Sequence, residues 1–393
     1  MTKAIVVGGG PAGASAALGL LKQGFEVSLI EKRTQWSGRV CGAFLNSEAI
    51  RHLEWLNVME EVKKAGCVTV SKTSITSLLR PSSEPILFSF PTPGISLPRQ
   101  ALEEILLNEV RKKGGRIHMG SRVTSVDKSG SNWRVFIRQQ TPPPRFELTV
   151  VDPLEKKEKA DTLEAPLIVM AYGRFSFGEI LSTHPQNGWY GWNATFSRVP
   201  QKPGELSLHF YPGGYVGIVT FNNGESNVCG LQYRTSETPL VWDTIFDQAV
   251  ARQPGLKRML SQSQRMSSWR GVGPLPFSTA LTPSEGAILV GDAAAVGDPF
   301  IGEGIGRALA AGPMLATAID LAKKKSSAQE LSRIYASLWK KAYSKRLKMG
   351  SVFRKGLQHS RVGGLLSELL IKQVWIRQIV IPKLHVGFSA PLR

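Results

Sequence analysis

The sequence is poor in cysteine and has no long apolar run. Its three cysteines, Cys41, Cys67 and Cys229, have no paired or metal-ligand spacing. This argues against a disulfide framework and fits a reducing, cytoplasmic compartment. No stretch reaches the about 18 apolar residues that a membrane-spanning helix needs. An apolar strand begins within a few residues of Met1, so we expect no signal peptide.

Several catalytic signatures are also missing. The six histidines show no metal-ligand spacing, so we expect no metal site. Neither a G-x-S-x-G nucleophile elbow nor a P-loop occurs. A second complete G-x-G-x-x-G is absent as well, which argues against a second, permanently bound dinucleotide.

Acidic residues are scarce towards the C-terminus. The net charge is +19, and residues 321–393 hold sixteen Lys or Arg against Glu330 and Glu368, a net +14 that leaves about +5 for the rest. A basic tail on a near-neutral body favours a membrane surface or an acidic partner over nucleic acid. For the basic, apolar segment 365–384 two interpretations stay open, an amphipathic helix in a membrane interface or a helix packed on the body.

The N-terminal stretch has the pattern of a nucleotide-binding βαβ unit. Residues 4–7 form an apolar run, residues 8–13 read Gly-Gly-Gly-Pro-Ala-Gly, and residues 14–21 are good helix formers. A second apolar run, 27–30, ends at Glu31, about 20 residues beyond the glycines, where the dinucleotide fingerprint places an acid. The pattern predicts dinucleotide binding and leaves NAD(P) and FAD both open.

Each glycine of this loop has its own task. Gly8 permits the tight turn, Gly10 lets backbone N–H groups approach a pyrophosphate, and Gly13 allows close packing of helix and strand. The helix N-terminus offers unpaired N–H donors to the pyrophosphate, and Glu31 can accept hydrogen bonds from a ribose.

A second stretch, Gly286–Gly312, also joins a strand to a helix. The apolar run 287–290 leads into Gly291-Asp292, then into the turn Pro299–Gly304, and one helix is expected from Ile305 through Leu321. An acid at the end of a buried strand is placed to bond a polyol. The alternative is a purely structural strand–turn–helix.

Between these stretches the pattern changes character. Residues 47–64 and 100–113 read as helices, and 68–95 as an excursion of alternating β-type and turn residues in which Pro81, Pro85, Pro91 and Pro93 act as breakers. Residues 139–163 read as a surface hairpin or insertion. Residues 189–233 are β-rich with a hairpin signal at Asn222-Asn223-Gly224. Helical stretches follow at 244–261 and 327–355.

The loop Gly38–Leu45 contains Arg39, Cys41 and Gly42. Small residues leave Cys41 room to approach a flat ligand, although a small buried core residue explains it equally well. Arg39 by itself reads as a solvated charge.

Together these segments resemble flavoproteins of the para-hydroxybenzoate-hydroxylase fold, most closely the geranylgeranyl reductase branch, over residues 1–320. The resemblance implies an α/β fold with a Rossmann-type FAD-binding domain, an inserted antiparallel β substrate domain and a C-terminal helical tail. The expected FAD-binding parts are 1–75, 96–180 and 269–325, the substrate parts are 76–95 and 181–268, and the basic helical region is 326–393.

The resemblance also implies a role for individual residues. Asp292 would bond the ribityl chain, Pro299–Gly304 would line the flavin ring, and Cys41 would shape the flavin face or donate a proton. The expected cofactor-binding residues are Gly8, Gly10, Pro11, Ala12, Gly13, Glu31, Lys32, Arg39, Cys41, Gly42, Arg99, Val123, Gly173, Gly291, Asp292, Pro299, Gly302, Gly304 and Ile305.

Two positions depart from the family pattern. Gly217 stands where the reductases' substrate motif has an aromatic residue, which weakens the case for a large isoprenoid slot. Tyr172 precedes Gly173 where hydroxylases carry an aspartate linked to FAD and NADPH. Direct NADPH-driven hydroxylation is weakened by this second change.

The expected protein is an FAD-dependent oxidoreductase acting on an apolar or aromatic small molecule, isoprenoid or polyketide-like, through reductase-type hydride chemistry. NAD(P)H or another reductant would be a transient electron donor, and the substrate would lie between the flavin and residues 180–270. The alternatives are a monooxygenase of the same fold and a non-catalytic flavin-binding protein at a membrane. Peripheral membrane contact would use the basic C-terminal region.

Overall fold

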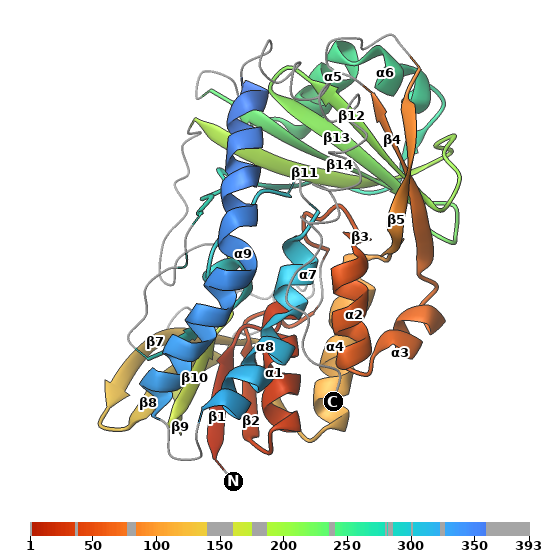
Figure 1. Ribbon diagram of the computed structural model, residues 1–393. Helices are drawn as coiled ribbons and strands as arrows, with labels where there is room; N and C mark the ends of the chain where they lie inside the picture. Colours follow the sequence, from red (N-terminus) through yellow and green to blue (C-terminus); the bar gives the residue numbers. More distant parts are fainter. Residues whose placement is uncertain are drawn as a thin grey trace, which may run out of the picture.

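The computed structural model describes residues 2–35, 38–76, 84–139, 160–174, 187–235, 240–279, 281, 286–299, 302–322 and 327–358. Figure 1 shows two main layers, a Rossmann-type unit that contains the N-terminus and a large twisted sheet beyond it. The long helix α9 (Ala328–Gln358) runs along both. Segment 365–384 and most of the insertion 139–163 lie outside the described residues.

The Rossmann-type unit is built on a five-stranded sheet whose pairs are all parallel. Its strand order is β17 (Ile288–Leu289), β10 (Leu167–Met170), β1 (Lys3–Val7), β2 (Glu26–Glu31) and β6 (Arg116–Met119). Residues 4–7 of β1 are buried because the sheet is covered on both faces. α1 (Pro11–Lys22), α4 (Arg99–Lys112) and α8 (Ala311–Leu321) are the helices of this unit. The second apolar stretch of the sequence therefore returns to the sheet of the first.

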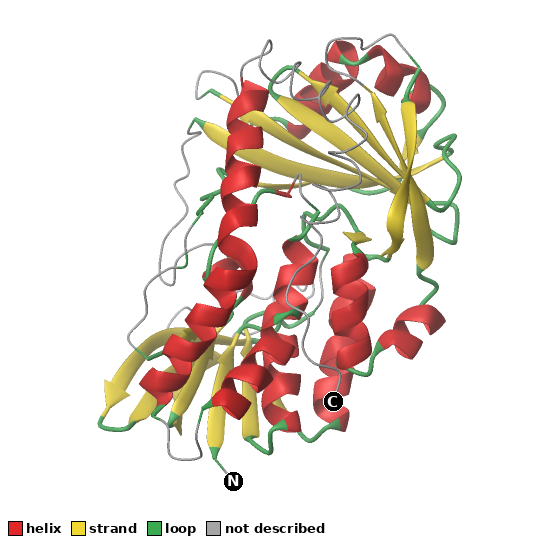
Figure 2. Ribbon diagram, in the orientation of Figure 1, coloured by secondary structure: helices red, strands yellow, loops and turns green. Residues whose placement is uncertain are grey.

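The large sheet is mainly antiparallel. Its order is β15 (Gln264–Arg265), β11 (Gly188–Ser197), β14 (Ser226–Arg234), β13 (Gly214–Thr220), β12 (Glu205–Tyr211), β4 (Val68–Thr76), β5 (Ile86–Ser96) and β3 (Phe44–Leu45), and β16 (Arg270–Val272) also pairs with β11. The predicted hairpin at Asn222–Gly224 joins β13 to β14. Two helices, α5 (Trp242–Arg252) and α6 (Pro254–Leu260), cover the outer face, as Figure 2 shows.

Smaller elements complete the described fold. α2 (Ser47–Trp55) and α3 (Met59–Lys64) form the predicted helical pair, and a short helix η1 (Gly291–Ala293) follows β17. A separate antiparallel sheet contains β7 (Ser121–Ser129), β8 (Asn132–Gln139) and β9 (Ala160–Ala165).

The expectation that Pro91 and Pro93 break the strand is wrong. β5 runs through both prolines, but its pairing with β4 shifts register between Gly94, which is opposite Val70, and Ser89, which is opposite Lys72. The prolines fall in the unpaired stretch of this bulge, where a missing N–H costs no ladder hydrogen bond.

The expectation of one continuous helix from Ile305 through Leu321 is also wrong. The chain forms α7 (Gly304–Leu309) and α8, which meet at Ala310. Pro313 has no N–H to offer the carbonyl of Leu309, so that carbonyl accepts the Ser15 hydroxyl of α1 instead, at 2.5 Å. The same hydroxyl oxygen accepts the N–H of Gly312 at 2.9 Å.

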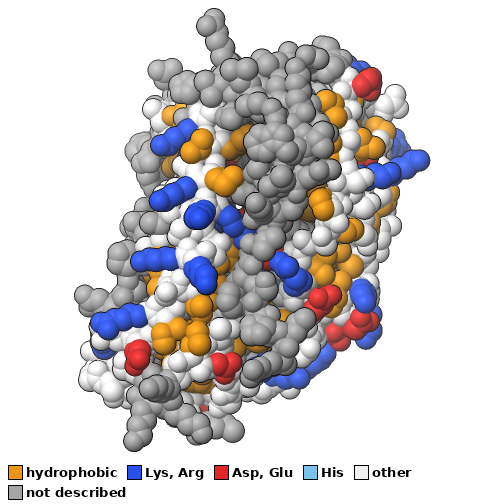
Figure 3. Space-filling view, in the orientation of Figure 1, with side chains coloured by type: hydrophobic (Ala, Val, Ile, Leu, Met, Phe, Trp, Pro, Cys, Tyr) orange, Lys and Arg blue, Asp and Glu red, His pale blue; other side chains and the backbone are white. Residues whose placement is uncertain are grey.

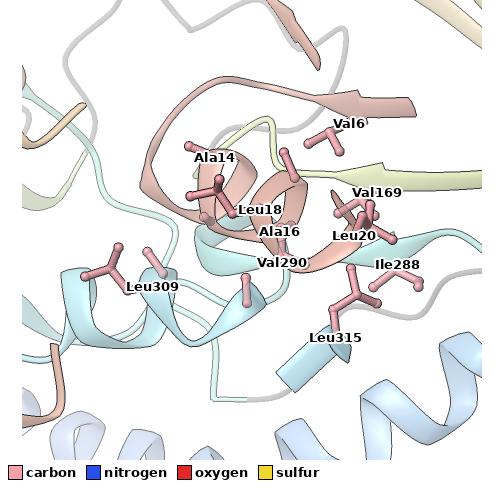
Figure 4. Packing of buried hydrophobic residues seen from close by; sticks show 14 of the residues in the cluster. Val6, Ala14, Ala16, Leu18, Leu20, Val169, Ile288, Val290, Leu309 and Leu315 are labelled. Carbon is pink, nitrogen blue, oxygen red and sulfur yellow. The ribbon is translucent and has the colours of Figure 1, made fainter. Parts of the chain in front are cut away.

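The main core lies between the parallel sheet and its helices. Figure 4 shows Val6, Val169 and Ile288 of three neighbouring strands together with Leu20 and Leu315 of α1 and α8. α1 and α8 approach closely because both carry glycine at the contact: a Cβ on Gly19 would lie 2.8 Å from the Cα of Gly312.

Helix α9 packs against both layers. Trp339, Tyr343 and Leu347 are buried in the main core, and Leu357 reaches a cluster on the inner face of the large sheet. Residues 327–355 were expected to be helical and basic, and α9 confirms the helix. Within the described ranges, no helix combines the length and apolar character needed to cross a bilayer.

Candidate cofactor site

The glycine loop joins β1 to α1 in the tight turn that the motif predicts. Gly8 has φ of +108°, and a Cβ there would overlap the carbonyl oxygen of Ala171. A Cβ on Gly13 would overlap the carbonyl oxygen of Gly8. Above Gly10 the space is open, since the nearest atom to a Cβ there is Nη1 of Arg39, at 4.0 Å. The start of α1 therefore presents the backbone N–H groups of Gly10, Ala12 and Gly13, whereas Pro11 has none. A helix N-terminus of this kind can bind a pyrophosphate.

Glu31 ends β2 beside this loop. Its carboxylate accepts hydrogen bonds from the Gly9 N–H at 2.7 Å and from Nε of Arg33 at 2.9 Å. Burial would raise the pKa of Glu31, but the hydrogen bonds and charge of Arg33 lower it below its usual value. An ionised carboxylate in this position is a strong acceptor for ribose hydroxyls.

A chain of ion pairs extends from Glu31 to the start of α4. Arg33 also contacts the buried carboxylate of Glu103 at 3.2 Å, and Arg99 donates to the same carboxylate at 2.9 Å. Arg99 is thereby fixed at the first position of α4 by its i+4 partner. Close by, partial burial and then the charges of Arg122 and Arg39 lower the pKa of Lys32. Val123, the residue after Arg122, packs against the main core.

Gly291 and Asp292 meet the glycine loop, which brings the two distant motifs into one place. Gly291 has φ of +60°, and a Cβ there would lie 2.6 Å from Cβ of Ala12. The Asp292 side chain is 27% exposed and is paired with Nη2 of Arg307 at 3.1 Å and with Nη2 of Arg174 at 3.5 Å. A carboxylate therefore faces the same volume as the N-terminus of α1.

The Gly38–Leu45 loop connects this volume to the large sheet. The side chain of Asn227, on β14, donates to the carbonyl of Cys41 at 3.0 Å. A Cβ on Gly42 would lie 3.5 Å from Sγ of Cys229, and the thiol of Cys41 accepts the Ala43 N–H at 3.3 Å. Burial raises the pKa of the Cys229 thiol to about 12, which keeps it neutral.

The turn expected at the flavin ring lies between this loop and α7. Gly302 has φ of +67°, and a Cβ there would be 3.6 Å from the ring of Phe44. Around Gly304, no described heavy atom lies within 4 Å of a Cβ position, and Ile305 is buried. Pro299 is exposed and its carbonyl accepts the Gly302 N–H at 3.0 Å, while residues 300 and 301 lie outside the described residues.

Gly173 completes the set of expected residues. It follows β10 with φ of +95°, and a Cβ there would meet no described atom within 4 Å. The structure therefore brings the glycine loop, Glu31 and Gly291-Asp292 together at the carboxyl ends of the parallel strands, and Gly173 follows the carboxyl end of β10. Ligands bind at this edge in open α/β sheets.

Some charged residues of the site are not recognisable from motifs. Arg307 holds Asp292 from within α7 and is only 4% exposed. Arg346 of α9 bonds Glu303 and Glu48, both buried. The sequence offers one signal for each of these arginines. Arg307 is the single cation in the apolar sequence of α7, and Arg346 has the helical spacing that puts it on the same buried face of α9 as Trp339 and Tyr343.

The residues present fit FAD. Two paired carboxylates, Glu31 at the end of β2 and Asp292 after β17, are acceptors of the kind that a ribose and a ribityl chain would need. Among the described residues, a Cβ on Gly10 would meet only Nη1 of Arg39, at 4.0 Å, and a Cβ on Gly304 would meet no atom within 4 Å, so neither position is filled by a side chain.

Comparison with known proteins points to the same cofactor. Residues 1–176 match the family described as FAD binding domain. The menaquinone reductase of Mycobacterium tuberculosis (strain ATCC 25618 / H37Rv) is 25% identical over 363 residues, which cover 87% of this chain and 80% of that protein.

Two solved structures share the fold. A geranylgeranyl bacteriochlorophyll reductase-like protein from Thermoplasma acidophilum has a TM-score of 0.72 at 20% identity, covering 95% of this chain and 92% of its own. HpxO of Klebsiella pneumoniae, complexed with FAD and uric acid, has a TM-score of 0.73 at 15% identity. The match covers 100% of this chain and 98% of the HpxO chain.

The chain is an FAD-dependent oxidoreductase with the para-hydroxybenzoate-hydroxylase fold, and FAD is its cofactor. The expected likeness to the geranylgeranyl reductases is confirmed by the Thermoplasma structure and by the reductases among its relatives.

Proposed function

We propose that the enzyme reduces an apolar small molecule carrying an isoprenoid or quinone-like group, by hydride transfer from reduced FAD. The supporting observation is the contact between the Cys41–Gly42 loop and the inner face of the large sheet. That face carries the apolar side chains Tyr215, Leu231 and Val219, on the side away from α5 and α6. An apolar substrate between this face and the flavin would be shielded from water.

The residues of the chain would divide the work in a simple way. FAD supplies the two-electron chemistry. Glu31 and Asp292 would hold the cofactor, and the Asn227 hydrogen bond fixes the Cys41 loop, which would border it. Cys41 would donate a proton to the reduced substrate or shape the surface that the substrate contacts.

Anaerobic reoxidation of the photoreduced enzyme tests this proposal. A menaquinone or a geranylgeranyl lipid should reoxidise the enzyme-bound flavin faster than it reoxidises free flavin, with a saturable dependence on concentration. Cys41→Ser should slow this step, whereas Cys67→Ser, a matched change on the loop before β4, should leave it unchanged. Reoxidation no faster than that of free flavin by any apolar acceptor contradicts the proposal.

The same experiment in air separates the monooxygenase alternative. Tyr172 stands where a hydroxylase would place an aspartate, and a phenol cannot replace that carboxylate at neutral pH. We therefore expect reduced product without incorporated oxygen. An ¹⁸O-labelled hydroxylated product would favour the alternative, and no turnover with any acceptor would favour a non-catalytic flavin protein.

We also propose that the outer face of α9 docks on an anionic lipid surface. The exposed residues of this lysine face are Arg333, Lys340, Lys341, Lys345, Lys348, Met349, Val352 and Lys355. Figure 3 shows Lys and Arg side chains along this side of the molecule, with hydrophobic side chains among them. Beyond Glu330 the exposed residues of α9 include no acid. Each lysine near an anionic membrane contributes about 1 kcal/mol, and exposed apolar side chains add insertion.

Vesicle sedimentation tests the lysine face. The wild type should bind phosphatidylglycerol vesicles in a salt-sensitive way and phosphatidylcholine vesicles weakly. Replacing Lys341, Lys345 and Lys348 by Glu should abolish this binding, whereas the same change at Lys63, Lys112 and Lys113, exposed lysines of α3 and α4, should not. Equal sedimentation of the two triple variants would contradict the proposal.

A further inference from the structure

Two buried carboxyls share one guanidinium where α2, α9 and the turn before α7 meet. Arg346 donates through Nε to Glu303 at 2.8 Å and through Nη2 to Glu48 at 2.7 Å. The exposed fractions are 0% for Glu48, 4% for Glu303 and 5% for Arg346. With both acids ionised, this cluster would carry one uncompensated negative charge away from water, which is costly.

The surroundings of Glu48 favour its ionised form more strongly than those of Glu303 do. Glu48 also accepts the Tyr343 hydroxyl at 2.9 Å and lies 3.6 Å from Nε2 of His52. Although burial opposes it, the contacts of Glu48 with His52 and Arg346 lower the pKa of Glu48 to about 2. Burial, together with the charge of Glu48, raises the pKa of Glu303 to about 7 against the opposing effects of Arg346 and Arg307. Glu303 is the member of the cluster that titrates near neutrality.

Glu303 borders the cofactor region directly. It stands between Gly302, which is next to Phe44, and Gly304, which faces open space. One turn further along, Arg307 is paired with Asp292. A change of charge near Asp292 therefore acts electrostatically on Glu303 through the buried Arg307, because screening is weak where water is excluded.

We infer that Glu303 takes up a proton when the flavin site gains negative charge, with Arg346 and Glu48 as positioning residues that set its readiness to do so. Two electrons and one proton added to the flavin leave one negative charge on the ring system. A second proton then passes from solvent to the Glu303 carboxylate, which becomes a neutral carboxyl. The inference needs bound FAD but not the proposed substrate class, so the two can fail separately.

The midpoint potential of enzyme-bound FAD, measured against pH, tests the inference. Around and above pH 7 the wild-type slope should be steeper than that of Glu303→Gln by up to one proton per two electrons, about 30 mV per pH unit. Equal slopes at every pH would overturn the inference. Glu109→Gln is the matched control, because this largely buried carboxylate on α4 pairs with Lys112 and Lys113 instead. It should keep the wild-type slope.

Two further measurements keep the inference decidable if Glu303→Gln binds FAD poorly. Glu48→Gln removes the competing negative charge, so the steep region should move to lower pH. Redox-difference infrared spectra of the wild type labelled with ¹³C-glutamate should show a label-sensitive protonated carboxyl appearing on reduction. A spectrum without that band, or a steep region unmoved by Glu48→Gln, would contradict the inference.

Discussion

At the scale of single residues, the site depends on charged groups that are held by other charged groups. Asp292 is fixed by Arg307 and Arg174, and Glu31 by Arg33. Such pairing holds each carboxylate in a fixed orientation, so that little side-chain reorganisation would be needed when FAD hydroxyls arrive. The cost of losing one carboxylate should therefore appear in cofactor affinity.

Asp292→Asn should weaken FAD binding by about 10- to 100-fold. A hydrogen bond to a charged acceptor is worth about 1.5–3 kcal/mol, and every 1.4 kcal/mol is tenfold in affinity. Titration of the apoprotein, followed by flavin fluorescence, measures the change. Asp320→Asn on α8, exposed and bonded to Gln23, is the matched control and should bind normally. An unchanged dissociation constant for Asp292→Asn would remove Asp292 from the site.

Glu303 should make the stability of the apoprotein fall with rising pH. Its pKa of about 7 in the folded chain exceeds the usual 4.5, so its contribution is complete below pH 4.5 and is lost as pH rises through 7. The loss is about 3 kcal/mol, since one pKa unit corresponds to about 1.4 kcal/mol. Urea unfolding at pH 5 and pH 8 should show a smaller fall for Glu303→Gln than for the wild type. Parallel falls would show that Glu303 is not the group responsible. Glu48 does not interfere, because its lowered pKa confines its effect to pH below 4.5.

At the scale of elements, the sequence allowed the main units to be predicted but not the junctions. Strand–loop–helix patterns identified β1, α1 and β17 because their apolar runs are strict and their glycines have few alternatives. The break between α7 and α8 has one local signal, Pro313, but the hydroxyl that replaces its missing N–H belongs to Ser15, almost 300 residues away in sequence. The bulge in β5 was missed because a proline excludes a ladder hydrogen bond only where one is required.

Ser15→Ala tests the explanation of that helix break. Removing the hydroxyl leaves the carbonyl of Leu309 and the N–H of Gly312 buried without this partner. Each loss costs about 1–3 kcal/mol, so the free energy of unfolding should drop by about 2–6 kcal/mol in urea titrations. Ser261→Ala, which removes an exposed hydroxyl bonded to the Arg258 carbonyl, should cost far less. Similar losses in the two variants would show that Ser15 does not support the junction.

The candidate site could be predicted only in part, because a local sequence pattern does not reveal contacts between distant residues. Residues with a fixed place in a motif, such as Gly8, Glu31 and Asp292, could be named from the sequence. Arg346 and Glu48 could not, because they are 298 positions apart and no local pattern joins them. Buried cations such as Arg346 and Arg307 mark where charge must be compensated, but only the fold shows which acid compensates them.

At the scale of the whole molecule, the loop Gly38–Leu45 and α9 tie the large sheet to the Rossmann-type unit. Asn227 holds the Cys41 carbonyl, a Cβ on Gly38 would touch the Arg270 guanidinium, and Leu357 packs against the inner face of the sheet. Because the cofactor region lies between these contacts, the two layers should gain stability together when FAD binds.

Hydrogen exchange measures that coupling. At an FAD concentration of about 100 times the dissociation constant, a ligand bound only by the folded state adds about 2.7 kcal/mol of stability. Amides that exchange through global unfolding should then slow by about 100-fold, in β1 (Lys3–Val7) and equally in β14 (Ser226–Arg234). Asn227→Ala loosens the link and should reduce the gain in β14 while leaving that in β1. Slowing confined to β1 in the wild type would show that the large sheet unfolds independently of the cofactor.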